Sequence, residues 1–165
     1  MNIKLLDIDK QIWDEELEDF VPKTIFDAHT HLYKWSHTIK PQQESKGWQE
    51  IFGEKFPDVD WELLNSADEL LFPGREVHRL TTGIPFVYCD FEAANRYTAS
   101  EVSQDPESGA LMLIHPSMSP EQIENAIKKY KFIGFKPYRF YSVTGDPVEC
   151  RIMDFLPEQV GKRWQ

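Results

Sequence analysis

Two histidines separated by one residue are the strongest chemical signal in this sequence. His29 and His31 lie in the segment of residues 27–31, which reads Asp-Ala-His-Thr-His and follows a short extended run. On an extended backbone, residues two apart point to the same face. Both imidazoles can therefore be directed at one point, where they would serve as nitrogen ligands of zinc, iron or nickel. The alternative is a pair of half-exposed histidines in a turn, because motifs this short recur by chance.

An alternation of strands and helices accompanies the histidine pair. We predict strands over Thr24–Asp27, Glu76–Gly83, Ala110–Ile114 and Phe132–Lys136, and helices over Trp61–Phe72, Asp90–Ser103 and Ser119–Lys131. Asp90 and Ser119 are the predicted N-caps of the last two helices. Nearly continuous apolar strands are typical of parallel sheets that are buried on both faces. We therefore expect an α/β chain of about four strand–helix units joined by right-handed crossovers.

Three segments stand outside this alternation. Residues 1–23 are expected to form an N-terminal helical extension, with a short amphipathic helix over Trp13–Phe20. Residues 34–60 are expected to be a long loop excursion carrying one or two short helices. Asp154–Val160 has the pattern of a first helical turn, but residues 161–165 abandon it, which indicates a chain cut short. All 165 residues are assigned to one domain.

The composition indicates one globular unit. Hydrophobic residues make up 41% of the chain and aromatic residues 13%, which excludes a highly charged disordered protein. The net charge is −10, from 18 basic and 28 acidic residues, so we expect no nucleic-acid partner. No apolar run approaches the ~18 residues of a membrane span, and no secretory signal begins the chain. We therefore expect a cytoplasmic protein with no membrane partner.

Residues 25–32 resemble the first-strand metal motif of the amidohydrolase superfamily. Three later features resemble its amidohydrolase-related (amidohydrolase 2) branch: Asn95 within a helix, a strand ending in His115-Pro116, and the strand over residues 134–136. They occur in the family's order, and the resemblance covers about residues 24–141. It implies a TIM-barrel-like metal-dependent hydrolase fold with a divalent metal at the carboxyl ends of its strands. His29 and His31 match two of the metal ligands, and the metal would be zinc, or else iron or manganese.

The resemblance also implies a reaction class. A metal in such a site activates a water molecule and polarises the carbonyl group of a small-molecule substrate. The usual outcome in the family is hydrolysis of an amide, ester or lactone bond, and some members carry out decarboxylation.

Lys136 is the candidate catalytic residue, and three interpretations of it remain open. It falls at the end of the predicted fourth strand, where some amidohydrolases carry a carbamylated lysine that bridges two metals. A cationic Lys136 could instead clamp a substrate carboxylate together with Arg139. The third interpretation is a strand-end lysine that reaches solvent. Tyr138, between these two residues, and His115 are further substrate-binding candidates, and a structural, hydrogen-bonded histidine is the alternative for His115.

The predicted strands account for about half a barrel. A complete barrel of this type needs about 250 residues and eight strands, and the family's later ligands have no counterpart positions here. We therefore expect an N-terminal half in which the first and fourth strands are open edges. A homo-oligomer, with two copies pairing these edges around a twofold axis, would close them. The rival interpretation is a catalytically inactive remnant or interaction module that keeps the scaffold.

Overall fold

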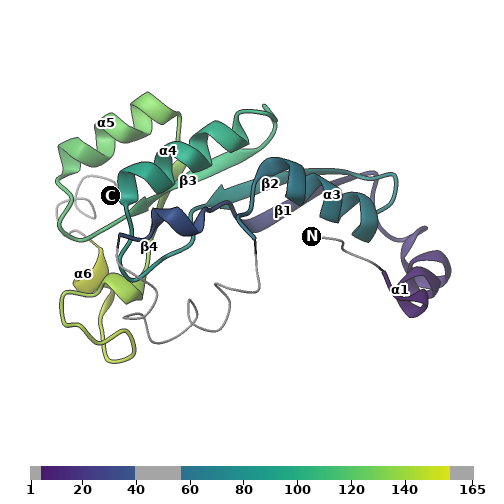
Figure 1. Ribbon diagram of the computed structural model, residues 1–165, viewed down its shortest axis with the longest axis horizontal. Helices are drawn as coiled ribbons and strands as arrows, with labels where there is room; N and C mark the ends of the chain where they lie inside the picture. The colour runs from purple at the N-terminus through teal and green to yellow at the C-terminus, as the bar shows by residue number, and fades with distance from the viewer. Residues whose placement is uncertain (1–4, 40–56, 157–165) are drawn as a thin grey trace.

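A parallel sheet forms the centre of the computed structural model, which describes residues 5–39 and 57–156. Its strands are β1 (Thr24–His31), β2 (Glu76–Thr82), β3 (Gly109–Ile114) and β4 (Gly134–Pro137). They are hydrogen-bonded in chain order, and every pair is parallel. Helices α3 (Trp61–Leu71), α4 (Phe91–Val102) and α5 (Pro120–Tyr130) connect successive strands (Figure 1). The prediction of an α/β chain with parallel strands is confirmed.

The helices begin at the residues whose side chains cap them. The side chain of Asp90 accepts a hydrogen bond from the backbone N–H of Ala93, and Ser119 accepts one from Gln122. Both predicted N-caps are confirmed. These bonds satisfy N–H groups that have no partner within the first helical turn, so the helices start at a defined distance from the strands.

The two faces of the sheet have different surroundings. The helices cover the outer face, where Ala110, Met112 and Ile114 of β3 pack with Ile123 of α5. Strand pairing assigns a second set of residues to the opposite face, which we call the inner face: His31, Thr82, Leu111, Leu113 and Lys136. A residue at the carboxyl end of any strand can therefore share the inner face with His31.

The side chain of Asn95 in α4 bonds to the backbone of β3 at a point beyond the end of β2. Its side-chain amide donates to the carbonyl oxygen of Leu113 at 2.9 Å and accepts from the Leu113 N–H at 2.8 Å. Asn95 is buried, so these bonds satisfy backbone groups that water cannot reach. The residue thus fixes α4 against β3 at the carboxyl end of the sheet.

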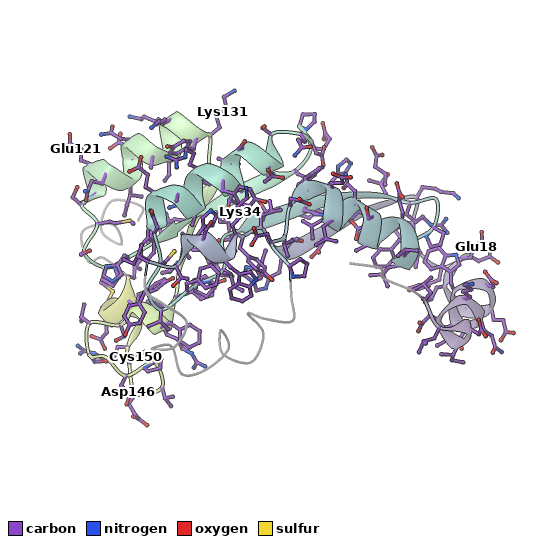
Figure 2. All side chains as sticks on the ribbon, viewed as in Figure 1. Glu18, Lys34, Glu121, Lys131, Asp146 and Cys150 are labelled. Atoms are coloured by element: carbon purple, nitrogen blue, oxygen red, sulfur yellow. The ribbon has the colours of Figure 1, made fainter. Side chains whose placement is uncertain are left out.

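Several element boundaries differ from the predictions. The N-terminal extension begins its helix at Asp7, as α1 (Asp7–Ile12), and continues as the π-helical segment η1 (Trp13–Leu17). It lies at the opposite end of the molecule from α5, as the position of Glu18 shows (Figure 2). β1 extends to His31, so the histidine pair belongs to the strand.

The remaining differences concern the later loops and the end of the chain. β4 begins at Gly134, two residues later than predicted, and Phe132 belongs to the core cluster that contains Met112. Within the long excursion, the described part contains the 3₁₀ segment η2 (Trp35–His37), and residues 40–56 lie outside the described residues. The last helix of the described residues is α6 (Ile152–Phe155), and the predicted continuation to Val160 also lies outside those residues. In the described ranges, no helix has the length and apolar character needed to cross a membrane.

Candidate metal site

A β-bulge in β1 determines which face of the sheet His31 occupies. Asp27 pairs with Arg79 and Thr30 pairs with Thr81, so residues 28 and 29 of β1 stand opposite a single residue of β2. One extra residue reverses the side-chain alternation of everything that follows it. His31 consequently pairs with Thr82 and lies on the inner face. Without the bulge it would share the helix-covered face with Arg79.

The carboxylate of Asp27 spans this bulge. One oxygen accepts the backbone N–H of His29 at 3.0 Å, and the other accepts the hydroxyl of Thr30 at 2.7 Å. Partial burial by itself would raise the pKa of Asp27, but the hydrogen bonds from Thr30 and His29 hold it below its ordinary value. Asp27 is therefore ionised at neutral pH, and its negatively charged carboxylate accepts both hydrogen bonds.

The imidazoles of His29 and His31 lie next to each other. Their ring centroids are 5.0 Å apart and the rings are tilted by 57°. His29 is exposed and His31 is half-buried. The structure therefore brings together the two residues that the sequence pairs, at the carboxyl end of β1.

A backbone carbonyl selects the tautomer of His31. The Nδ1 atom of His31 lies 3.3 Å from the carbonyl oxygen of Gly83, the residue after β2. Because a carbonyl oxygen only accepts hydrogen bonds, Nδ1 carries the hydrogen in this contact and Nε2 keeps its lone pair. In metal-binding histidines, one ring nitrogen is commonly bonded to a carbonyl oxygen in this way while the other nitrogen binds the metal.

The surroundings of His31 favour its neutral form. Burial lowers the pKa of His31, and the nearby charges of His29 and Lys136 lower it further, against the opposing effect of backbone hydrogen bonds to Gly83 and Thr82. The imidazole is therefore neutral at pH 7, which is the state that binds a metal. Within residues 5–39 and 57–156, no group of three or more His, Cys, Asp or Glu side chains gathers closely enough to hold an ion.

No protein-family model, curated protein or solved structure matches this chain. The geometry of the site is therefore the basis for assigning its chemistry.

Lys136 shares the inner face with His31 and lies close enough for its charge to act on that imidazole. Its Nζ atom is 5.7 Å from the centroid of the Tyr138 ring. Arg139 belongs to the 3₁₀ segment η4 (Arg139–Tyr141), where it is exposed, and its guanidinium forms no ion pair with any described residue. The Lys136 ammonium thus lies over the face of the Tyr138 ring.

His115 occupies an aromatic setting at the end of β3. Its ring centroid is 5.5 Å from that of Phe91 and 5.6 Å from that of Tyr141. The backbone N–H of Ser117 donates to Nδ1 at 3.1 Å, so Nε2 carries the hydrogen in the neutral ring. Burial lowers the pKa of His115. This environment matches the structural, hydrogen-bonded alternative for His115.

Sequence reasoning missed two residues of the site, Asp27 and Gly83. Asp27 is part of the quoted motif, and an aspartate two residues before a backbone N–H that it can accept is a recognisable turn signal. The contribution of Gly83 is a carbonyl group, which any residue type could supply, so nothing in the sequence identifies it.

Proposed function

We propose that this chain is a metal-dependent hydrolase of the amidohydrolase type, whose four strand–helix units correspond to half of a TIM-type barrel. The observation that carries the proposal is the hydrogen bond from His31 Nδ1 to the Gly83 carbonyl. With the hydrogen on Nδ1, the lone pair of Nε2 would be the metal-binding atom of a neutral imidazole, beside a second imidazole. The order of the strands and their parallel pairing are those expected of consecutive barrel units.

The donor set fits a divalent transition metal. His29 and His31 would supply two imidazole nitrogens, which suit zinc, and also iron or manganese in a mixed ligand set. Burial keeps His31 neutral, so a metal would have little competition from protons for its ring nitrogen at pH 7. Asp27 and Gly83 would orient the two rings through their hydrogen bonds.

The reaction class follows from this donor set and from the sequence resemblance. When bound, the metal would lower the pKa of a coordinated water to near 7 and polarise a substrate carbonyl. The proposed reaction is hydrolysis of an amide, ester or lactone bond, with decarboxylation as the variant known in the family. The inner-face residues of this chain would orient the small-molecule substrate.

Metal analysis with matched variants tests this function. We expect about one equivalent of zinc, iron or manganese to remain after dialysis of the wild-type protein. His29→Asn combined with His31→Asn should abolish binding, whereas His78→Asn, which changes a histidine near the amino end of β2, should retain it. Wild-type protein with less than about a tenth of an equivalent of each metal would end the proposal.

A second candidate function is a non-catalytic interaction module that keeps the scaffold. It is favoured by the donor set, since the described residues offer the metal two imidazoles, whereas catalytic zinc sites usually have three protein ligands. Hydrolysis assays of the metal-loaded protein on a panel of esters, amides and lactones separate the two candidates. The module would be favoured if the protein binds metal but shows no hydrolysis that is lost in the His31→Asn variant.

A further inference from the structure

We propose that Arg79 is a positioning residue for the histidine pair. Its guanidinium, on the helix-covered face of the sheet, holds the carboxylate of Asp27 in place, and that carboxylate fixes the bulge that contains His29 and precedes His31. The inference rests on the proposed function for its link to metal binding, but the support of the bulge itself requires no metal.

Arg79 and Asp27 are neighbours on adjacent strands. They are register partners in the parallel pairing of β1 with β2, so their side chains project to the same face of the sheet. Asp27 is also the last residue of β1 before the register shift. The positive charge of Arg79 lowers the pKa of Asp27, which shows that the guanidinium acts on this carboxylate through space. Arg79 is therefore in position to attract the carboxylate that spans the bulge.

The position of Arg79 is fixed by contacts with several elements. The residue is buried, and its guanidinium forms an ion pair with Asp68 of α3. The guanidinium carbon lies 4.6 Å from the centroid of the Trp61 ring, and the backbone N–H donates to the hydroxyl of Ser108 at 2.7 Å. A charge held in a buried place is screened less by water than an exposed one, so it acts more strongly on its neighbours.

One guanidinium serves two carboxylates. The ion pair with Asp68 uses the Nη2 atom of Arg79, and the Nη1 atom is buried without a hydrogen-bond partner among the described residues. Burial raises the pKa of Asp68, the charge of Arg79 opposes this effect, and the charge of Asp27 adds to it. The two carboxylates therefore repel each other, and the cation between them offsets that repulsion.

Loss of this attraction would act on the bulge through Asp27. Because Asp27 is exposed, water competes for the oxygens that accept the His29 N–H and the Thr30 hydroxyl. Without Arg79, repulsion from Asp68 would turn the Asp27 carboxylate toward solvent and release both donors. The alternation of side chains past the bulge sets the face of His31, so a bulge without this support would hold the imidazole less firmly.

Two variants separate positioning from stability. Asp68→Leu removes the ion pair but keeps the Arg79 charge, whereas Asp68→Leu combined with Arg79→Met removes the charge as well and is the more stable of the two. In EDTA-treated protein, we expect the His29 amide hydrogen to exchange at the wild-type rate in Asp68→Leu and about tenfold faster in the double variant. Zinc affinity should follow the same order, with about a tenfold loss in the double variant alone. A purely structural role predicts the opposite order, since the less stable protein would then be the more affected one.

Further variants keep the outcomes distinct. Arg79→Lys keeps the positive charge and should retain most of the His29 protection, whereas Arg79→Gln should lose it, which gives a second comparison if the double variant does not fold. When Asp27→Ala is already present, adding Asp68→Leu with Arg79→Met should weaken zinc binding by less than about twofold, because the carboxylate through which Arg79 acts is gone. Wild-type exchange of His29 in both the double variant and Arg79→Gln would overturn the proposal, as would a full tenfold further loss on the Asp27→Ala background. Failure of the wild type to bind any metal would instead remove the proposed function and leave the role of Arg79 to be decided by His29 exchange alone.

Discussion

The Nδ1 atom of His31, the last residue of β1, lies 3.3 Å from the carbonyl oxygen of Gly83, the residue that follows β2. This contact couples the orientation of a candidate metal ligand to the backbone of the neighbouring strand. It can form only because the bulge in β1 brings His31 to the inner face. The bulge in β1, the His31–Gly83 hydrogen bond and the tautomer of His31 therefore depend on one another.

Asp27 should control zinc affinity through the bulge. Asp27→Ala removes the acceptor of the His29 N–H and of the Thr30 hydroxyl, so we expect zinc affinity to fall about 10- to 100-fold, as for other residues that orient metal ligands. Asp27→Asn keeps one acceptor oxygen and should retain most of the affinity. Zinc competition with a chromophoric chelator provides the dissociation constants.

The matched control is Asp146→Ala. Asp146 accepts backbone N–H groups of Val148 and Glu149 in an exposed loop, which makes it a similar carboxylate outside the site. Equal zinc affinities in the Asp27→Ala and Asp146→Ala proteins would contradict the prediction, because they would show that zinc affinity does not depend on Asp27.

Asn95 should be one of the most sensitive positions for stability. Asn95→Ala leaves both the N–H and the C=O of Leu113 buried without partners, so we expect the free energy of unfolding to fall by roughly 2–4 kcal/mol. Urea denaturation should show a lower midpoint with an unchanged slope. Ser103→Ala removes an exposed side-chain bond to the Ser100 carbonyl and should change the free energy by less than about 0.5 kcal/mol. Similar losses in the two variants would contradict the assignment.

The ion pair of the buried Arg79 and the half-buried Asp68 should show strong coupling between its two residues. Arg79 is 2% exposed, pairs with Asp68 of α3, and stacks on the Trp61 ring with its guanidinium carbon 4.6 Å from the ring centroid. Asp68→Leu alone leaves a buried cation unpaired and should cost about 3 kcal/mol of unfolding free energy. Adding Arg79→Met should restore part of that loss, because an apolar pair fits the same space. If the two losses simply add in a double-mutant cycle, the ion pair is not coupled as proposed.

Stability should depend on pH through His78. The hydrogen bond from its ring to Asp105, at 2.8 Å, raises the pKa of His78, and the charges of Asp105, Glu76 and Glu107 act in the same direction. A histidine with a raised pKa in the folded state contributes stability below the unfolded value of about 6.5, and that contribution is lost as pH rises through the folded pKa. The free energy of unfolding should therefore fall more steeply above pH 6.5 in the wild type than in His78→Asn. Parallel profiles would disprove the linkage.

The sequence predicted the elements of this fold well because local signals determine them. Side-chain caps at Asp90 and Ser119 and the apolar run of residues 110–114 depend on neighbours along the chain, and the structure confirms all three. The N-terminal helix begins at Asp7, earlier than the predicted start at Trp13, and none of residues 7–12 is buried.

The candidate site was predictable only in part. The spacing of His29 and His31 indicated two adjacent imidazoles, and the structure places the rings together. The rule of alternating side chains could not show which face they occupy, because the bulge reverses the alternation before His31.

The most direct test of the central claim is long-range ¹H–¹⁵N NMR of the histidine rings during a zinc titration. We predict that His31 in the metal-free protein carries its hydrogen on Nδ1, as the Gly83 contact requires. On addition of zinc, the Nε2 signal of His31 and one ring nitrogen of His29 should shift together and saturate at about one equivalent, while those of His78 and His115 remain in place. A hydrogen on Nε2 of metal-free His31, or zinc-independent signals from both His29 and His31, would contradict the account.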